Sequence, residues 1–104
     1  DRLRARVDPA EAVSRLEAEM VREMAQALGR TEDKLNYALL RLELAARAID
    51  EAPDPLVRYD RVKEFNTLRD EAIQARRNLQ IHREAIGIRR NRMLDDLYPI
   101  PPRR

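Results

Sequence analysis

The stretch Ala52-Pro53-Asp54-Pro55, close to the middle of this chain of 104 residues, decides the fold. Pro53 cannot continue a helix, because it lacks a backbone N–H and its ring clashes with the preceding turn. Asp54 followed by Pro55 is typical of a helix start, with the aspartate as cap and the proline at the first helical position. The stretch therefore predicts that one helix ends and another begins around a tight turn.

The same signals mark the outer ends of the two predicted helices. Asp8-Pro9 repeats the Asp-Pro start near the N-terminus, and three of the six prolines follow Tyr98. Two helices of nearly equal length around one short turn form an antiparallel helical hairpin, an all-α fold. The sequence thus predicts a single helical domain over 1–104, with a helix at 9–51, a turn at 52–55, a helix at 56–97 and a proline-rich tail at 98–104.

The composition excludes several other classes of protein. Charged residues make up 38% and aromatic residues 4%, and two glycines are too few for the turns of a β-sandwich or barrel. The absence of cysteine excludes a disulfide or cysteine–zinc scaffold and fits a cytoplasmic location. No apolar run approaches the ~18 residues of a membrane span. The first residue is Asp1 rather than methionine, which leaves open whether a native segment precedes it.

Apolar residues recur along both predicted helices at the steps of three, four and seven that favour a helix. When the hairpin closes at its turn, the two stripes face each other in register, which predicts six facing pairs: Val13–Met93, Met20–Ile86, Leu28–Leu79, Leu35–Ala72, Leu39–Leu68 and Leu42–Phe65. Gly29 and Gly87 offer an alternative, in which one or both helices break or kink there. Because the stripes pass both glycines in phase, continuous helices are favoured.

A second apolar stripe on the 56–97 helix, made of Ile73, Ile81 and Ile88, predicts self-association. These side chains lie on a different face from Leu79 and Ile86, and a monomeric hairpin would leave them in water. Two hairpins that bury their second stripes against each other form a four-helix bundle, so we expect a homodimer. The alternative is that these are scattered exposed apolar residues, which are common.

An arginine row, consisting of Arg69, Arg76, Arg83 and Arg90, repeats every seven residues within 69–92. We expect these arginines to form ion pairs along the seam with Glu17, Glu23 and Glu32, either of the same chain or of the partner subunit. The alternative function is association with nucleic acid, because a straight basic edge can follow a phosphate backbone. No aromatic residues are interleaved with the row, so stacking on bases is not indicated.

Nothing in the sequence indicates an enzyme, a cofactor or a metal. His82 is the only histidine and Ser14 the only serine, so neither a nucleophilic triad nor a carboxylate di-metal motif can be assembled. The three methionines lie on the apolar stripes and are interpreted as core residues. The expected role is a structural or protein-interaction module without a membrane partner, in which a second copy is the first candidate partner and another protein the second.

The tail predicts a contact with the rest of the chain. Tyr98 and Ile100 are large apolar groups that would otherwise lie in water. We therefore expect the tail to turn back and one of them to touch the start of the first helix, near Val7 and Val13, in its own chain or in the partner subunit. The alternative is a free ligand for SH3-type domains, because Pro99, Pro102 and Arg104 form a P-x-x-P-x-R pattern.

Three short strings, Ala27-Leu28-Gly29-Arg30, Arg83-Glu84-Ala85-Ile86-Gly87 and Tyr98-Pro99-Ile100-Pro101-Pro102-Arg103, carry a resemblance to a family. The chain resembles small uncharacterised bacterial helical proteins, a domain of unknown function. This resemblance implies a bacterial source and no particular activity. It also implies that Gly29 and Gly87 allow helices to approach each other closely.

Overall fold

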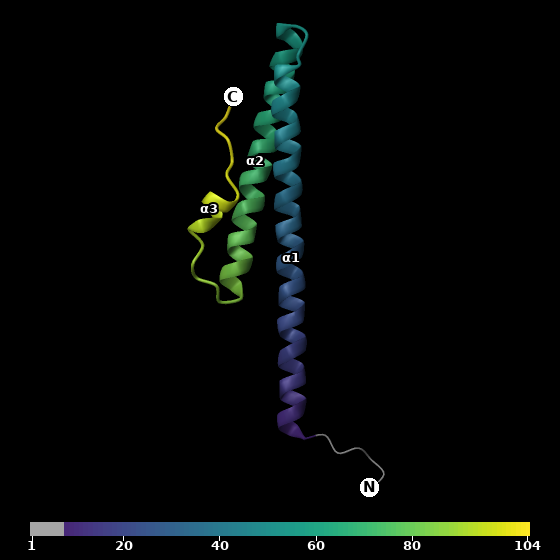
Figure 1. Ribbon diagram of the computed structural model, residues 1–104, viewed down its shortest axis with the longest axis vertical. Helices are drawn as coiled ribbons and strands as arrows, with labels where there is room; N and C mark the ends of the chain where they lie inside the picture. Colours follow the sequence, from purple (N-terminus) through teal and green to yellow (C-terminus); the bar gives the residue numbers. More distant parts are fainter. Residues whose placement is uncertain (1–7) are drawn as a thin grey trace, which may run out of the picture.

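The computed structural model describes residues 8–104, in which three helices and no strand are found: α1 (Pro9–Asp50), α2 (Pro55–Ala85) and α3 (Met93–Leu97). The two long helices lie side by side and run antiparallel around the turn at 51–54 (Figure 1). The molecule is elongated, with extents of 81 × 29 × 15 Å. The predicted all-α helical hairpin is confirmed.

Both long helices begin at the Asp-Pro pairs. The Asp8 Oδ1 atom accepts a hydrogen bond from the Ala10 N–H at 3.1 Å, and the Asp54 Oδ1 atom accepts one from the Val57 N–H at 2.9 Å. The prolines that follow need no hydrogen-bond partner at the first helical position. These local signals set the start of each helix and the turn between them.

The α1 helix passes through Gly29 without a break, so the three-helix alternative is wrong at this point. Thr31 lies inside the helix and is buried, and its hydroxyl donates to the Ala27 carbonyl at 3.1 Å instead of capping a new helix. A Cβ atom added to Gly29 would meet no atom within 4 Å. Gly29 is therefore not the site of close helix approach that the family resemblance implies.

The second helix is shorter than the predicted 56–97 helix, because α2 ends at Ala85. Gly87 has a φ of +92°, a left-handed conformation that glycine adopts without strain. The Ile88 N–H bonds the Arg83 carbonyl at 2.9 Å, and the Gly87 N–H bonds the Glu84 carbonyl at 3.0 Å. This is the Schellman arrangement that ends helices. The prediction of a continuous helix to residue 97 is wrong from Ile86 onward.

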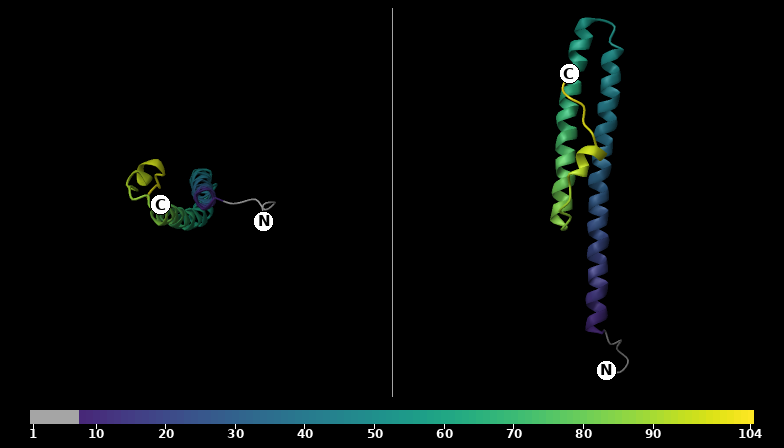
Figure 2. Two further views of the ribbon diagram at one scale, coloured as in Figure 1. Left: turned by 90° about the horizontal axis from the view of Figure 1, so that it is seen from below. Right: turned by 60° about the vertical axis from the view of Figure 1, so that its left-hand side comes forward.

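After α2 the chain reverses direction. Residues 86–92 form a connector, α3 follows, and the tail at 98–104 runs back beside α2 toward the turn of the hairpin (Figure 2). Seen from below, α2 lies between α1 and α3. The C-terminal segment is thus a third layer along one side of the hairpin.

The core consists of two neighbouring clusters along the seam between α1 and α2. One contains Leu42, Ile49, Phe65, Leu68 and Ala72, and the other contains Leu35, Leu79 and Leu94. The predicted facing pair of Leu42 and Phe65 lies within the first cluster. The predicted pair of Val13 and Met93 is wrong, because both side chains are exposed.

The two glycines predict opposite effects of the same substitution. Gly29→Ala is expected to raise the free energy of unfolding by about 1 kcal/mol, because the helix interior favours alanine and the new methyl group has space. Gly87→Ala is expected to lower it by roughly 1–2 kcal/mol, because alanine is strained at positive φ. Urea unfolding of both variants checks this, and effects of the same sign would contradict it.

Candidate interaction site

The N-terminal part of α1 extends beyond the rest of the hairpin. The last turn of α2 and Ile86 line a small pocket together with Met24 and Leu28, which locates the end of α2 along α1. Residues 9–23 continue past this point (Figure 1). We call them the protruding segment, which is roughly 22 Å long at ~1.5 Å per residue.

One face of the protruding segment is apolar and exposed. It consists of Val13, Leu16 and Met20, and it ends at Met24, which directly follows the segment and borders the end of α2. We call these four side chains the uncovered face. Val13, Leu16, Met20 and Met24 are 54%, 58%, 48% and 39% exposed, respectively. Their steps of three and four continue the stripe that α2 covers from Leu28 onward. The prediction that Met20 and Met24 are core residues is wrong within the described chain, because both are exposed. The α2 helix ends too early to cover Met20, and its last turn only borders Met24.

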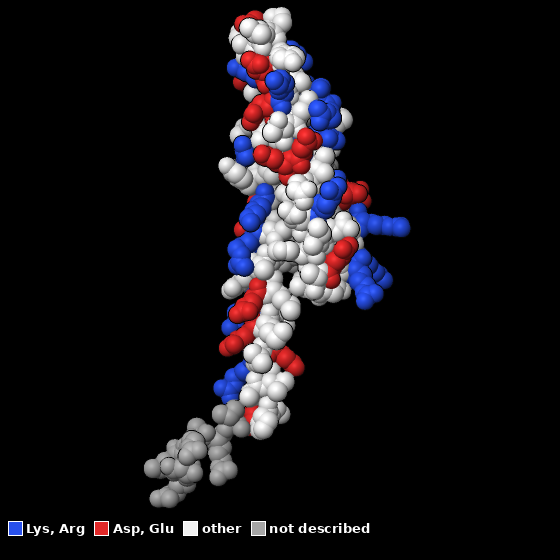
Figure 3. All heavy atoms as spheres, turned by 180° about the vertical axis from the view of Figure 1, so that it is seen from behind, with Lys and Arg blue, Asp and Glu red and all other residues white. Residues whose placement is uncertain are grey.

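An exposed face of this kind favours binding to another helix. Burial of a large apolar side chain contributes about 1.5–3 kcal/mol, so four side chains in a row offer a large free energy to a partner. Amphipathic helices are recognised through such anchors, spaced three and four residues apart. White surface, broken by acidic and basic side chains, runs along this end of the molecule in Figure 3.

The arginine row holds the C-terminal segment against α2. Arg83 Nε donates to Asn91 Oδ1 at 2.7 Å, Arg76 NH1 donates to the Tyr98 carbonyl at 3.0 Å, and Arg69 Nε donates to the Pro101 carbonyl at 2.7 Å. Because successive arginines bind successive parts of a segment that runs antiparallel to α2, their seven-residue spacing matches the path of the tail.

Within one chain, the predicted partners of the arginine row are wrong. Among residues 8–104, no ion pair joins the row to Glu17, Glu23 or Glu32, and the carboxylate beside Arg76 is that of Asp95, at 3.4 Å. Arg90 lies in the connector beyond α2, where its carbonyl accepts a hydrogen bond from Arg83. The row is therefore not a continuous basic edge of one helix.

The second apolar stripe is only partly exposed. Ile81 is exposed, whereas Ile73 and Ile88 are half-buried. Ile73 is four residues from Arg69 and three from Arg76, so it shares the side of α2 that holds the tail. The stripe thus offers less apolar surface than a free α2 would, because the C-terminal segment occupies this side.

The tail contacts the middle of the hairpin instead of the start of α1. Tyr98 packs against the cluster of Leu35, Leu79 and Leu94, and Ile100 packs against the cluster around Phe65. Within one chain, the prediction of a contact near Val13 is wrong, because α2 ends early and the tail then runs toward the turn. Val7, the other residue of that prediction, lies outside the described residues.

The end of the tail is also bound to the hairpin. The Arg104 N–H donates to Asn66 Oδ1 at 3.0 Å, and Asn66 Nδ2 donates to the Arg104 carbonyl at 3.3 Å. The Arg104 guanidinium lies 3.7 Å from the Asp50 carboxylate. These contacts place Pro99, Pro102 and Arg104 of the P-x-x-P-x-R pattern in a segment that is already docked.

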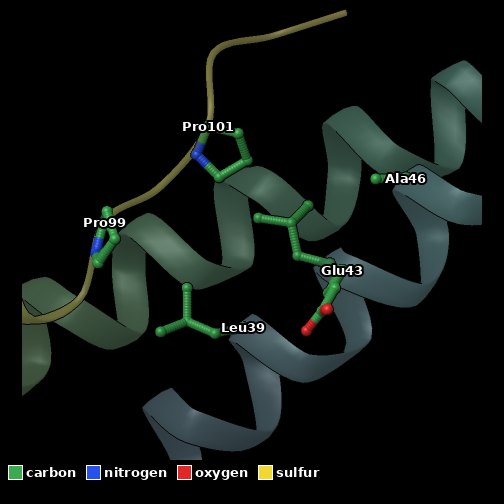
Figure 4. A pocket seen from close by; sticks show the side chains of 6 residues that line it. Leu39, Glu43, Ala46, Pro99 and Pro101 are labelled. Carbon is green, nitrogen blue, oxygen red and sulfur yellow. The ribbon is translucent and has the colours of Figure 1, made fainter.

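A shallow pocket of about 390 Å³ lies between the tail and α1. In Figure 4, Pro99 and Pro101 lie across it from Leu39, Glu43 and Ala46. Glu43 is the one charged group in the lining, and its carboxylate is 2.9 Å from the Arg47 guanidinium. The pocket offers apolar contact and no group poised for catalysis.

His82 forms a polar contact across the seam. Its Nδ1 atom is 2.7 Å from the Thr31 hydroxyl oxygen. Because the single hydroxyl hydrogen is donated to the Ala27 carbonyl, this contact requires Nδ1 to be the donor. The pair links α1 to the last turn of α2, which is a structural role. Over residues 8–104, no cluster of three or more His, Asp or Glu could hold a metal ion.

Comparisons with protein-family models, with curated proteins and with solved structures give no match to this chain. None of its described helices combines the length and apolar character needed to cross a membrane. Sequence reasoning missed the uncovered face as a site, although its residues were on the predicted stripe. The available signal was Gly87, because a helix end at this position leaves the first turns of α1 without a partner.

Proposed function

We propose that this protein is a non-enzymatic structural module that works as a homodimer and assembles through the uncovered face of α1. The observation that carries the proposal is the exposure of Val13, Leu16 and Met20 on a helix segment that extends past the end of α2, its partner helix within residues 8–104. A second copy is the partner with a matching surface, because it carries the same apolar stripe at the same spacing. Absence of cysteine supports a cytoplasmic location for this module.

The alternative function, association with nucleic acid, has less support. It rested on a free and continuous basic edge, whereas Arg69, Arg76 and Arg83 donate hydrogen bonds to the chain's own C-terminal segment. Arg69 and Arg76 side chains are also only 22% and 24% exposed. With these arginines engaged in contacts within the chain, the arginine row offers a phosphate backbone fewer free, aligned contacts.

The proposal predicts the molar mass of the protein in solution. Light scattering at micromolar concentration is expected to give about twice the chain mass of 12.2 kDa. Dilution is expected to lower the value toward that of one chain, because association depends on concentration. A stable mass of one chain at tens of micromolar would overturn the proposed function.

A further inference from the structure

We infer that two copies pair antiparallel through their protruding segments, so that the N-terminus of each α1 seats against the open end of the other copy's hairpin. This inference rests on the proposed function and adds the orientation and the register of the two copies. Three features of the chain support it: where α2 stops, which residues form the uncovered face, and how charge is distributed along the molecule.

The end of α2 leaves a place for an antiparallel helix. In the upper part of the hairpin, α2 covers the apolar stripe of α1 and runs in the opposite direction to it (Figure 1). Beyond Ile86, which lines a pocket with Met24 and Leu28, the stripe continues without cover. The protruding segment of a second copy, running antiparallel, takes the position that α2 would occupy if it were longer. The existing seam is thereby continued.

The same arrangement fixes a register. If the first residue of the incoming helix, Pro9, lies beside Met24, the two helices pair without a gap after α2. Counting along both helices then places Val13 of one copy opposite Met20 of the other, and Leu16 of each copy close to the two-fold axis. The register in which the incoming helix follows directly after α2 is thus also the one in which the apolar residues of the two uncovered faces pack against each other.

The charge distribution favours the antiparallel orientation. Residues 8–23 carry five acidic and two basic side chains, whereas residues 76–92 carry six arginines and one glutamate. Arg83 binds the neutral Asn91 and a backbone carbonyl, so its charge is not compensated there. Blue side chains project beside the open end in Figure 3. Antiparallel pairing brings the acidic end of each copy to the basic end of the other, whereas parallel pairing brings like charges together.

Disulfide crosslinking between two single-cysteine variants tests this inference. The natural chain has no cysteine, so Val13→Cys and Met20→Cys each introduce a unique thiol. In the proposed register, residues 13 and 20 of different copies are opposite each other. Two copies of the same residue are separated by about 10 Å along the helix axis, at ~1.5 Å per residue, which is too far for a disulfide. One variant carries a size tag, so that the mixed product can be recognised on a gel.

The two variants are mixed, equilibrated and oxidised in a glutathione buffer. The disulfide between Cys at 13 of one copy and Cys at 20 of the other is expected to be the main product. Each variant oxidised by itself is expected to form no disulfide-linked dimer. Disulfides that join position 13 to 13, or 20 to 20, would show that the two helices pair in parallel. This result would overturn the inference, but the proposed homodimer would stand. No crosslink, in a sample whose mass is that of two chains, would place the interface elsewhere and also overturn it. A mass of one chain in the natural protein would overturn the proposed function itself.

Discussion

Leu94→Ala is expected to destabilise the protein by about 2–4 kcal/mol, the cost of removing most of a buried leucine side chain and leaving a cavity. Leu94 is 2% exposed and packs against Leu35 and Leu79. It belongs to a helix of five residues that cannot be stable alone, so its burial depends on the return of the chain along α2. The loss is expected to appear in urea unfolding as a lower midpoint.

Leu97→Ala is the matched control for this prediction. Leu97 lies on the same short helix, three residues further on, but it is 65% exposed. Its replacement by alanine is expected to change the free energy of unfolding by less than about 0.5 kcal/mol. Equal effects of the two substitutions would contradict the docking of α3 on the hairpin.

Local signals made α1 and the turn predictable from the sequence. Each Asp-Pro pair supplies a cap and a compatible first residue within two positions, and Pro53 excludes a continuous helix at the turn. These effects do not depend on tertiary contacts. The predicted bounds of the first helix therefore agree with α1 to within one residue.

The end of α2 could not be predicted with the same means. The apolar step from Ile86 to Met93 is in phase with a longer helix, so periodicity favoured continuation. The structure instead uses the left-handed conformation of Gly87 and buries Leu94 on the hairpin, a contact between residues far apart in the sequence. The choice between the two is a balance of long-range packing energies that no local pattern contains.

The candidate interaction site also depends on whether the second helix ends at Ala85 or continues to residue 97. A helix to residue 97 would have covered Val13 and Met20 and kept the arginine row along one edge of a single helix. The shorter α2 exposes the first turns of α1 and turns the row into donors for the tail. The sequence therefore indicated which residues are apolar or basic, but their exposure and partners followed from where one helix stops.

The double variant Leu16→Glu with Met20→Glu is expected to abolish self-association. Each large apolar side chain contributes about 1.5–3 kcal/mol when buried, and the dimer would bury both in each copy. Since 1.4 kcal/mol corresponds to a tenfold change in Kd, the loss is expected to exceed a thousandfold. Both residues lie in the protruding segment away from the core clusters, so the hairpin itself is expected to keep its stability.

Leu40→Glu with Leu44→Glu is the matched control. These two leucines have the same four-residue spacing on the same helix as Leu16 and Met20. Their exposure is similar, 56% and 55% against 58% and 48%. They lie, however, where α1 is paired with α2. The control is expected to keep the mass of the natural protein, because the proposed interface does not include them.

Light scattering on the natural protein and on these two variants, at one micromolar-range concentration, tests whether the uncovered face is the dimer interface. The account predicts a mass of about two chains for the natural protein and for the Leu40/Leu44 variant, and 12.2 kDa for the Leu16/Met20 variant. It is contradicted if the Leu16/Met20 variant retains the mass of two chains, or if the Leu40/Leu44 variant is the one that falls to a single chain.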